Sequence, residues 1–404
     1  MRPPRPRAAL AALVLGTALL GIGAAGGPVA HGEDAPAAEV VPAGDLASDE
    51  RDAADVAFAT TVRFATAPEG FTPPPHAAEA SGLVVSPGGA VATTDRFVRR
   101  VEAAPAGVTL WGRVGDGPWE RARVVGRAWF ARLGVVRLAP TATPRRFAAF
   151  ATTPRQPRPR VVAAVAAGGP RVDLRAAPIA SLVWADPTVA GARLEVRRTS
   201  ADREPGRGAV VVGFRVAEAV VGRGVEGTPV FLANGRCAGL VLGVDADRPG
   251  AEAVRVVPAE VVAPWADRLA RDDRFDPLDL GVTFLPAPAE TGAAVVLPAD
   301  LEALRAGTAQ KGGAVAADLV RASPAMGVLW PGDLVVEIGG RAFVGEIAEC
   351  HALAAAAFEE GVPVDVVTWR GGKRAAVSIT PVRARTLYRD VAVEMERRAA
   401  RLDR

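Results

Sequence analysis

The sequence predicts a mainly β protein, in which an all-β region forms a barrel or a pair of barrels and a small α+β module follows. From Ala59 to about Pro258, short apolar runs recur between clusters of Gly, Pro and Asp, a spacing that is typical of barrels. From about Leu278 to Val382, similar runs flank a single helical stretch. The length of 404 residues also exceeds one ordinary core and fits two domains of unequal size.

The first region divides into strands and a closing helix. The β-type runs occupy residues 60–66, 81–86, 90–94, 107–114, 121–126, 133–139, 160–167, 192–198, 208–214, 228–234, 237–244 and 253–258. A helix is expected over 258–272, because proline stands at its start and Val261, Val262, Trp265 and Leu269 recur at helical spacing. These elements define a domain over 59–272.

The second region, 278–382, is a smaller mixed module. Strands are expected at 280–286, 313–320 and 333–343, and a helix at 346–360. A final strand pair spans 362–381 and turns at Gly371 and Gly372. A C-terminal helix is expected over 384–404, which packs on its own domain or, as the alternative, helps subunits to associate.

The first thirty residues read as an export signal. Arg2, Arg5 and Arg7 precede an apolar run that ends in small residues, as in a signal peptide. The run approaches the roughly 20 residues that cross a bilayer, so an uncleaved anchor is the alternative, and only then would the chain associate with a membrane. Residues 31–58 form a flexible spacer that runs into a short helix. We therefore expect an exported protein of the periplasm or cell envelope.

Charge and residue usage argue against several classes of partner. The formal net charge of +3 falls to zero once the three leader arginines are removed, so no nucleic-acid partner is expected. The two cysteines, Cys237 and Cys350, lie in different domains and are expected to be separate thiols. The three histidines, His31, His76 and His351, have no ligand-like spacing, and we expect neither a metal nor a cofactor.

Three segments of the first region resemble the HtrA family of exported serine proteases. They are "ASGLVVSPGGAVATTDRFV", "RARVVGRAWFARLGVVRL" and "GVEGTPVFLANGRCAGLVLG". The resemblance implies a trypsin-like double β-barrel, with Arg96 in the slot of the catalytic histidine, Arg132 in that of the aspartate and Glu226 in that of the serine. The frame of the last motif keeps Gly224, Gly227 and Pro229.

These three replacements remove the chemistry that the family motifs supply. A serine nucleophile needs a base that accepts its proton, and a guanidinium stays protonated and has no acceptor lone pair. We therefore interpret the barrels as a pseudoprotease with no catalytic residues. If the slots converge, Glu226 is expected beside Arg96 with Arg132 behind it, although Asp95 competes for Arg96.

The second region resembles the PDZ domains of the same family through "DLVRASPAMGVLWPGDLVVEIGGRAF". A PDZ groove binds an extended peptide between a strand edge and a helix, and a turn of backbone N–H groups receives the peptide's C-terminal carboxylate. The resemblance places the turn at Leu280, Gly281 and Val282, the strand at Thr283 and Phe284, and the helix face at Ile347, His351 and Ala354. The alternative for His351 is a solvated or merely packed helix residue.

The sequence thus favours an HtrA-like pseudoprotease that binds exposed segments or C-termini of envelope proteins without hydrolysing them. One alternative is an active HtrA-like endopeptidase in protein quality control. Another is a structural or regulatory subunit that associates with active relatives. The family implies a homotrimer, but the sequence itself indicates no interface.

Overall fold

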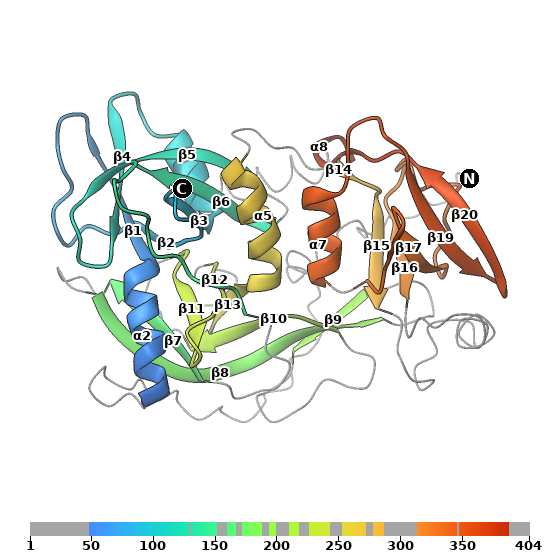
Figure 1. Ribbon diagram of the computed structural model, residues 1–404, viewed down its shortest axis with the longest axis horizontal. Coiled ribbons are helices and arrows are strands. Elements are labelled where there is room, and N and C mark those ends of the chain that lie inside the picture. The colour runs from blue at the N-terminus through green and yellow to red at the C-terminus, as the bar shows by residue number, and fades with distance from the viewer. Residues whose placement is uncertain are drawn as a thin grey trace, which may run out of the picture.

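The computed structural model describes the chain from residue 48 to residue 387, with gaps (Figure 1). The described ranges are 48–128, 131–151, 160–166, 172–187, 194–198, 210–217, 226–242, 253–271, 278–286, 313–345 and 347–387. The expected leader at 1–30, most of the spacer and most of the C-terminal helix lie outside these ranges. None of the described helices combines the length and the apolar character needed to cross a membrane.

The first sheet is a closed barrel with the strand order β1-β2-β3-β6-β5-β4. Its strands are β1 (Thr61–Pro68), β2 (Ala80–Val84), β3 (Ala90–Thr94), β4 (Val108–Val114), β5 (Glu120–Ala128) and β6 (Leu133–Leu138). Pairing between β1 and β4 closes the ring. Strands β2 and β3 are buried along their whole length, which matches their apolar composition. Helix α3 (Asp95–Glu102) follows β3 and packs on β5 and β6.

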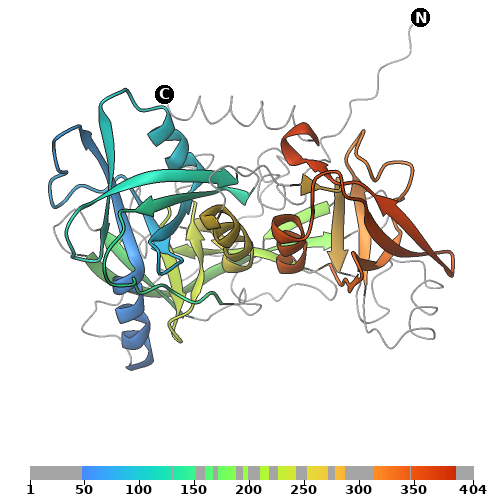
Figure 2. The same ribbon diagram turned by 45° about the horizontal axis from the view of Figure 1, so that its top comes forward.

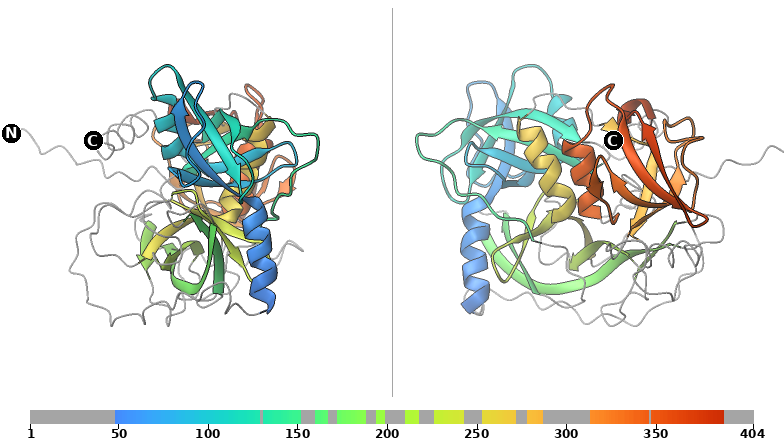
Figure 3. Two further views of the ribbon diagram at one scale, coloured as in Figure 1. Left: turned by 90° about the vertical axis from the view of Figure 1, so that its left-hand side faces the viewer. Right: turned by 45° about the vertical axis from the view of Figure 1, so that its right-hand side comes forward.

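The second sheet has seven strands in the order β10-β13-β12-β11-β7-β8-β9. They are β7 (Arg160–Ala166), β8 (Val172–Pro187), β9 (Leu194–Arg198), β10 (Val210–Ala217), β11 (Pro229–Leu232), β12 (Cys237–Val241) and β13 (Ala253–Pro258). Strand β10 pairs with β8 as well as with β13, so the pairings run in a ring. Helix α2 (Ser48–Thr60) packs against β7 at the far end of the molecule from β19 and β20 (Figure 3).

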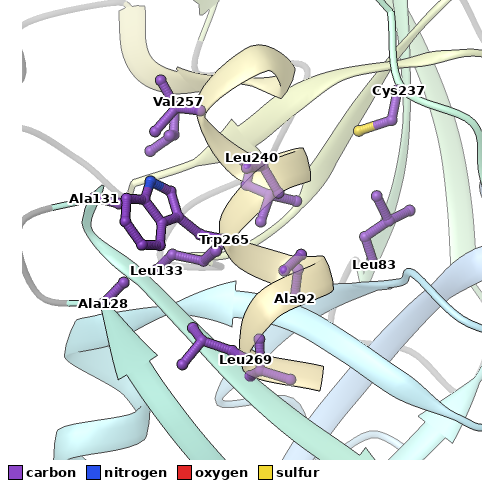
Figure 4. Close-up of a cluster of buried hydrophobic side chains, with 14 of the residues drawn as sticks. Leu83, Ala92, Ala128, Ala131, Leu133, Cys237, Leu240, Val257, Trp265 and Leu269 are labelled. Atoms are coloured by element: carbon purple, nitrogen blue, oxygen red, sulfur yellow. The ribbon is translucent and has the colours of Figure 1, made fainter. Parts of the chain in front are cut away.

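Helix α5 (Ala259–Arg271) lies between the closed barrel and the C-terminal part (Figures 1 and 2). Trp265 and Leu269 are fully buried, and they join one hydrophobic cluster with Leu133 of β6 and Leu240 of β12 (Figure 4). The helix expected over 258–272 is therefore present, and its apolar stripe binds both sheets together.

The C-terminal part contains an antiparallel sheet and a helix. Its strands β15 (Val282–Pro286), β16 (Ala314–Leu319), β17 (Leu334–Ile338), β19 (Val364–Arg370) and β20 (Lys373–Ile379) form a sheet in this order, and β18 (Arg341–Ala342) pairs with β17. Helix α7 (Ile347–Ala356) lies beside β15, and the short helix α8 (Ala384–Leu387) follows the sheet (Figure 1). A short pair joins β14 (Leu278–Asp279) to β21 (Val382–Arg383).

The expected mainly β architecture is thus observed, and some elements differ from the expectation, β8 and α3 among them. Strand β8 spans sixteen residues where no strand was expected. Pro178 interrupts this stretch, and proline within a run argues against a strand from sequence alone; in the structure it faces Arg160 at the end of β7. Helix α3 was also not expected, although Thr94 caps it and Phe97 and Val98 are buried beneath it.

Candidate functional site

The segment expected to hold a catalytic histidine is the start of α3. The Phe97 N–H donates to the Thr94 hydroxyl at 3.2 Å, which fixes the first turn of the helix. Gly134 on β6 lets α3 approach closely, because a Cβ at that position would lie 2.3 Å from Val98 Cγ2. Arg96 is thereby placed in the first turn of α3.

The Glu226–Gly227–Thr228 turn joins the closed barrel to the second sheet. The Ser81 N–H of β2 donates to the Glu226 carbonyl at 2.8 Å, and the Gly227 N–H donates to the Val241 carbonyl at 2.7 Å. Gly227 has φ +82°, and a Cβ there would lie 2.0 Å from the Ser81 carbonyl oxygen. Only glycine fits this position, so the turn is held tightly against β2.

The Glu226 side chain is buried and forms an ion pair. Its Oε1 lies 2.5 Å from Arg100 Nη1, with 4% of the glutamate side chain and 35% of the arginine side chain exposed. Burial raises the pKa of Glu226, while the charges of Arg100 and Arg96 and hydrogen bonds from Arg100 and Thr94 lower it. The carboxylate therefore takes its partner from the last turn of α3.

Arg132 and Asp95 complete this region. The Asp95 N–H donates to the Arg132 carbonyl at 3.1 Å, and Arg132 has a left-handed backbone with φ 56°. The Asp95 carboxylate pairs with Arg127 at 3.2 Å and with Arg99 at 3.5 Å. Glu226 pairs with Arg100, and the charge of Arg96 also lowers its pKa, so the place of Arg96 directly beside Glu226 stays a prediction.

The groups at this turn differ from those of a nucleophilic active site. Thr228, the hydroxyl nearest to Glu226 in the sequence, is fully buried. His76 is exposed in the loop between β1 and β2, and His351 lies on α7; His31 lies outside the described residues. Within the described part of the chain, no three His, Cys, Asp or Glu residues group together as a metal site would require. The turn holds a buried carboxylate against an arginine whose side chain is 35% exposed.

The second candidate site is the edge of β15. Among the described strands β15 pairs with β16 alone, so its other edge faces α7 (Figures 1 and 2). Phe284 is half-buried, and its ring meets that of Phe343 edge to face with centroids 4.9 Å apart. Thr283 lies opposite Asp318 on β16. A strand edge of this kind offers backbone N–H and C=O groups to an added strand.

The turn before β15 is closed by groups of the chain itself. Leu280, Gly281 and Val282 are buried, and the Gly281 N–H donates to Asp279 Oδ1 at 2.7 Å. Gly281 has φ +73°, and a Cβ there would lie 2.2 Å from Ser323 Cβ. The missing side chain of Gly281 leaves room for Ser323.

Two of the predicted site residues on helix α7, His351 and Ala354, lie against helix α5. His351 is buried, and its Nδ1 accepts a hydrogen bond of 2.7 Å from Trp265 Nε1–H. The two rings meet edge to face, and burial lowers the pKa of His351 to about 3. Ala354 belongs to the cluster around Trp265. Ile347 begins α7. The contacts of His351 are those of a packed helix residue.

Two site residues escaped the sequence reasoning. Arg100 stands four residues after Arg96, and this spacing places both on one helix face once α3 is recognised. Asp279 stands two residues before Gly281, where a short acid commonly accepts a backbone N–H of a turn. Recognising either required the local structure in addition to the motif.

Of the comparisons with known proteins, only the one with solved structures finds similar proteins. A scan against protein-family models and a search of curated proteins both find no match. The chain is similar to the HtrA-type protease AlgW, solved with a decapeptide, at 14% identity and a TM-score of 0.43, covering 82% of this chain and 98% of that one. It is also similar to the serine endoprotease from Yersinia pestis, at 15% identity and a TM-score of 0.42, covering 84% and 99%.

Proposed function

We propose that this chain is an exported HtrA-like pseudoprotease that binds extended protein segments along the edge of β15. Binding is by strand addition, in which the ligand backbone continues the β15–β20 sheet and its side chains supply specificity. The barrels act as a scaffold and do not hydrolyse the ligand. Unfolded or exposed segments of envelope proteins are the ligand class.

One observation carries the proposed loss of hydrolysis. At the turn where the resemblance puts a serine nucleophile, Glu226 is buried against Arg100. A carboxylate in an ion pair accepts hydrogen bonds but does not replace a serine hydroxyl with its own general base. The guanidinium of Arg96, one turn earlier on α3, remains protonated and supplies no base.

The open edge of β15 supports the proposed binding. The edge lies beside α7, so an added segment would have a sheet on one side and a helix on the other (Figure 1). Val282 and Leu280, at the start of this edge, belong to the module's hydrophobic core, which keeps the strand in place. A rigid strand edge lowers the entropic cost of ordering the ligand.

A backbone-modified ligand tests this mode of binding. Fluorescein-labelled dodecapeptides that bind the full chain are selected from a random library and resynthesised with N-methyl groups at alternate residues. Strand addition needs the ligand's backbone N–H groups, so methylation in the paired register should abolish binding, whereas methylation in the other register should not. Equal binding of all three forms would contradict strand addition. Cleavage of the bound peptides would favour an active endopeptidase.

A further inference from the structure

The turn that starts β15 has the position expected for a carboxylate-binding turn, but the backbone groups of its central residue, Gly281, are engaged within the chain. The Gly281 N–H is directed at Asp279 Oδ1, at 2.7 Å. The Gly281 carbonyl accepts from the Val320 N–H at 2.8 Å. Both backbone polar groups of Gly281 are therefore already bonded within the chain.

The opposite side of the turn is also filled. Ser323, which is buried, lies where a Gly281 side chain would be, with its Cβ 2.2 Å from the ideal Cβ position. The Ser323 N–H donates to the Val320 carbonyl at 3.0 Å, so a hydrogen-bonded turn holds this residue in place. A ligand carboxylate would have to displace Ser323 or compete with Asp279.

The carboxylate of Asp279 lies at the start of β15. Asp279 is 5% exposed, and its carboxylate acts on the neighbouring Cys350 thiol. Burial raises the pKa of Cys350, and the charges of Glu349 and Asp279 raise it further. A second carboxylate brought to the Gly281 turn would thus be placed next to an existing one, at a donor that is already occupied.

From these contacts we infer that the β15 edge selects internal segments of extended chains over free C-termini, and that Asp279 determines this selectivity. The inference rests on the proposed strand addition and narrows its ligand class. An internal segment presents only neutral amides to the turn, so it needs no donor from Gly281 and avoids the Asp279 carboxylate. The carboxylate of a free C-terminus loses its water there without gaining the usual backbone N–H group.

Matched peptide pairs test the inference. Dodecapeptides selected from a random library are made as free acids and as C-terminal amides, and their affinities for the full chain are measured by fluorescence anisotropy. For the wild-type chain the amide should bind more tightly than the acid. Asp279→Asn removes the charge and Asp279→Ala also frees the Gly281 N–H, so the acid should gain affinity in both, by about tenfold in Asp279→Ala, while the amide changes little.

The outcomes separate this inference from the proposed function. Acids that bind wild type as tightly as the amides, or more tightly, would overturn the inference and leave strand addition intact. Binding of neither form, or binding that N-methylation leaves unchanged, would overturn strand addition and the inference with it. Even if the Asp279 variants do not fold, the wild-type ratio of acid to amide affinity tests the selectivity itself.

Discussion

At the scale of single residues, Glu226 is the most informative position. Burial raises its pKa, so above the ordinary value of 4.5 the unfolded chain ionises more readily than the folded one. The stability that wild type owes to protonated Glu226 is therefore present at low pH and is lost as pH rises. Glu226→Gln keeps the shape without the charge, and solvent still reaches Arg100.

We expect Glu226→Gln to be within about 1 kcal/mol of wild type at pH 7.5, since desolvation offsets the attraction to Arg100. Relative to wild type, the variant should also become more stable between pH 4.5 and 7.5. Urea unfolding at both pH values measures the difference. A variant that is less stable by more than about 3 kcal/mol at pH 7.5 would mean that the ion pair is strongly stabilising.

Gly227 gives a second residue-scale prediction with a matched control. Gly227→Ala puts a methyl group 2.0 Å from the Ser81 carbonyl and requires φ +82°, whereas Gly70 has φ +86° and no atom within 4 Å of its missing Cβ. We expect Gly70→Ala to cost about 1 kcal/mol from backbone strain and Gly227→Ala at least about 3 kcal/mol in unfolding free energy. Equal costs would show that the turn is not held against β2.

At the scale of elements, helix α7 takes part in two cores. Ala354 and Ala355 pack with Trp265 of α5, while Cys350 and Leu353 pack with the core of the C-terminal module. The alanine-rich sequence predicts a helix but shows no single apolar stripe, so it cannot tell which neighbours the helix has. For the same reason the sequence left open whether His351 faces a ligand, solvent or a neighbouring helix.

The α5–α7 contact should weaken in acid. The His351 pKa is lowered to about 3 by burial, so between the ordinary value of 6.5 and 3 the unfolded chain binds a proton that the folded chain does not. The stability that the neutral His351 contributes is complete above pH 6.5 and is lost as the pH falls toward 3. From pH 7.5 to 5, wild type should lose about 2 kcal/mol more than His351→Asn, whose amide oxygen still accepts from Trp265.

Unfolding by urea at both pH values measures this loss, with His76→Asn as the control because His76 is exposed. The control should follow wild type. Equal pH dependence in wild type and His351→Asn would refute the role of the buried imidazole. Hydrogen exchange should place the loss of protection in α5 and α7, ahead of the closed barrel.

At the scale of the whole molecule, the sequence predicted most strands because alternating and continuous apolar runs between turn residues are local signals. Strand β8 was not predicted because Pro178 argues against a strand. Helix α3 was not predicted because its residues were assigned to a family motif instead. The site was predicted as far as Glu226 and the β15 segment. The partners Arg100, Asp279 and Ser323 could not be predicted, since they depend on how α3 and two turns pack.

The central claim, that the barrels do not hydrolyse peptide bonds, is tested most directly with unfolded casein. The full chain is incubated with it beside Glu226→Ser alone and the triple variant Arg96→His, Arg132→Asp, Glu226→Ser. The account predicts no cleavage by wild type. Regained activity in the triple variant would show in addition that the three positions converge. Cleavage by wild type above background, abolished by serine-protease inhibitors, would contradict the account and establish an active endopeptidase.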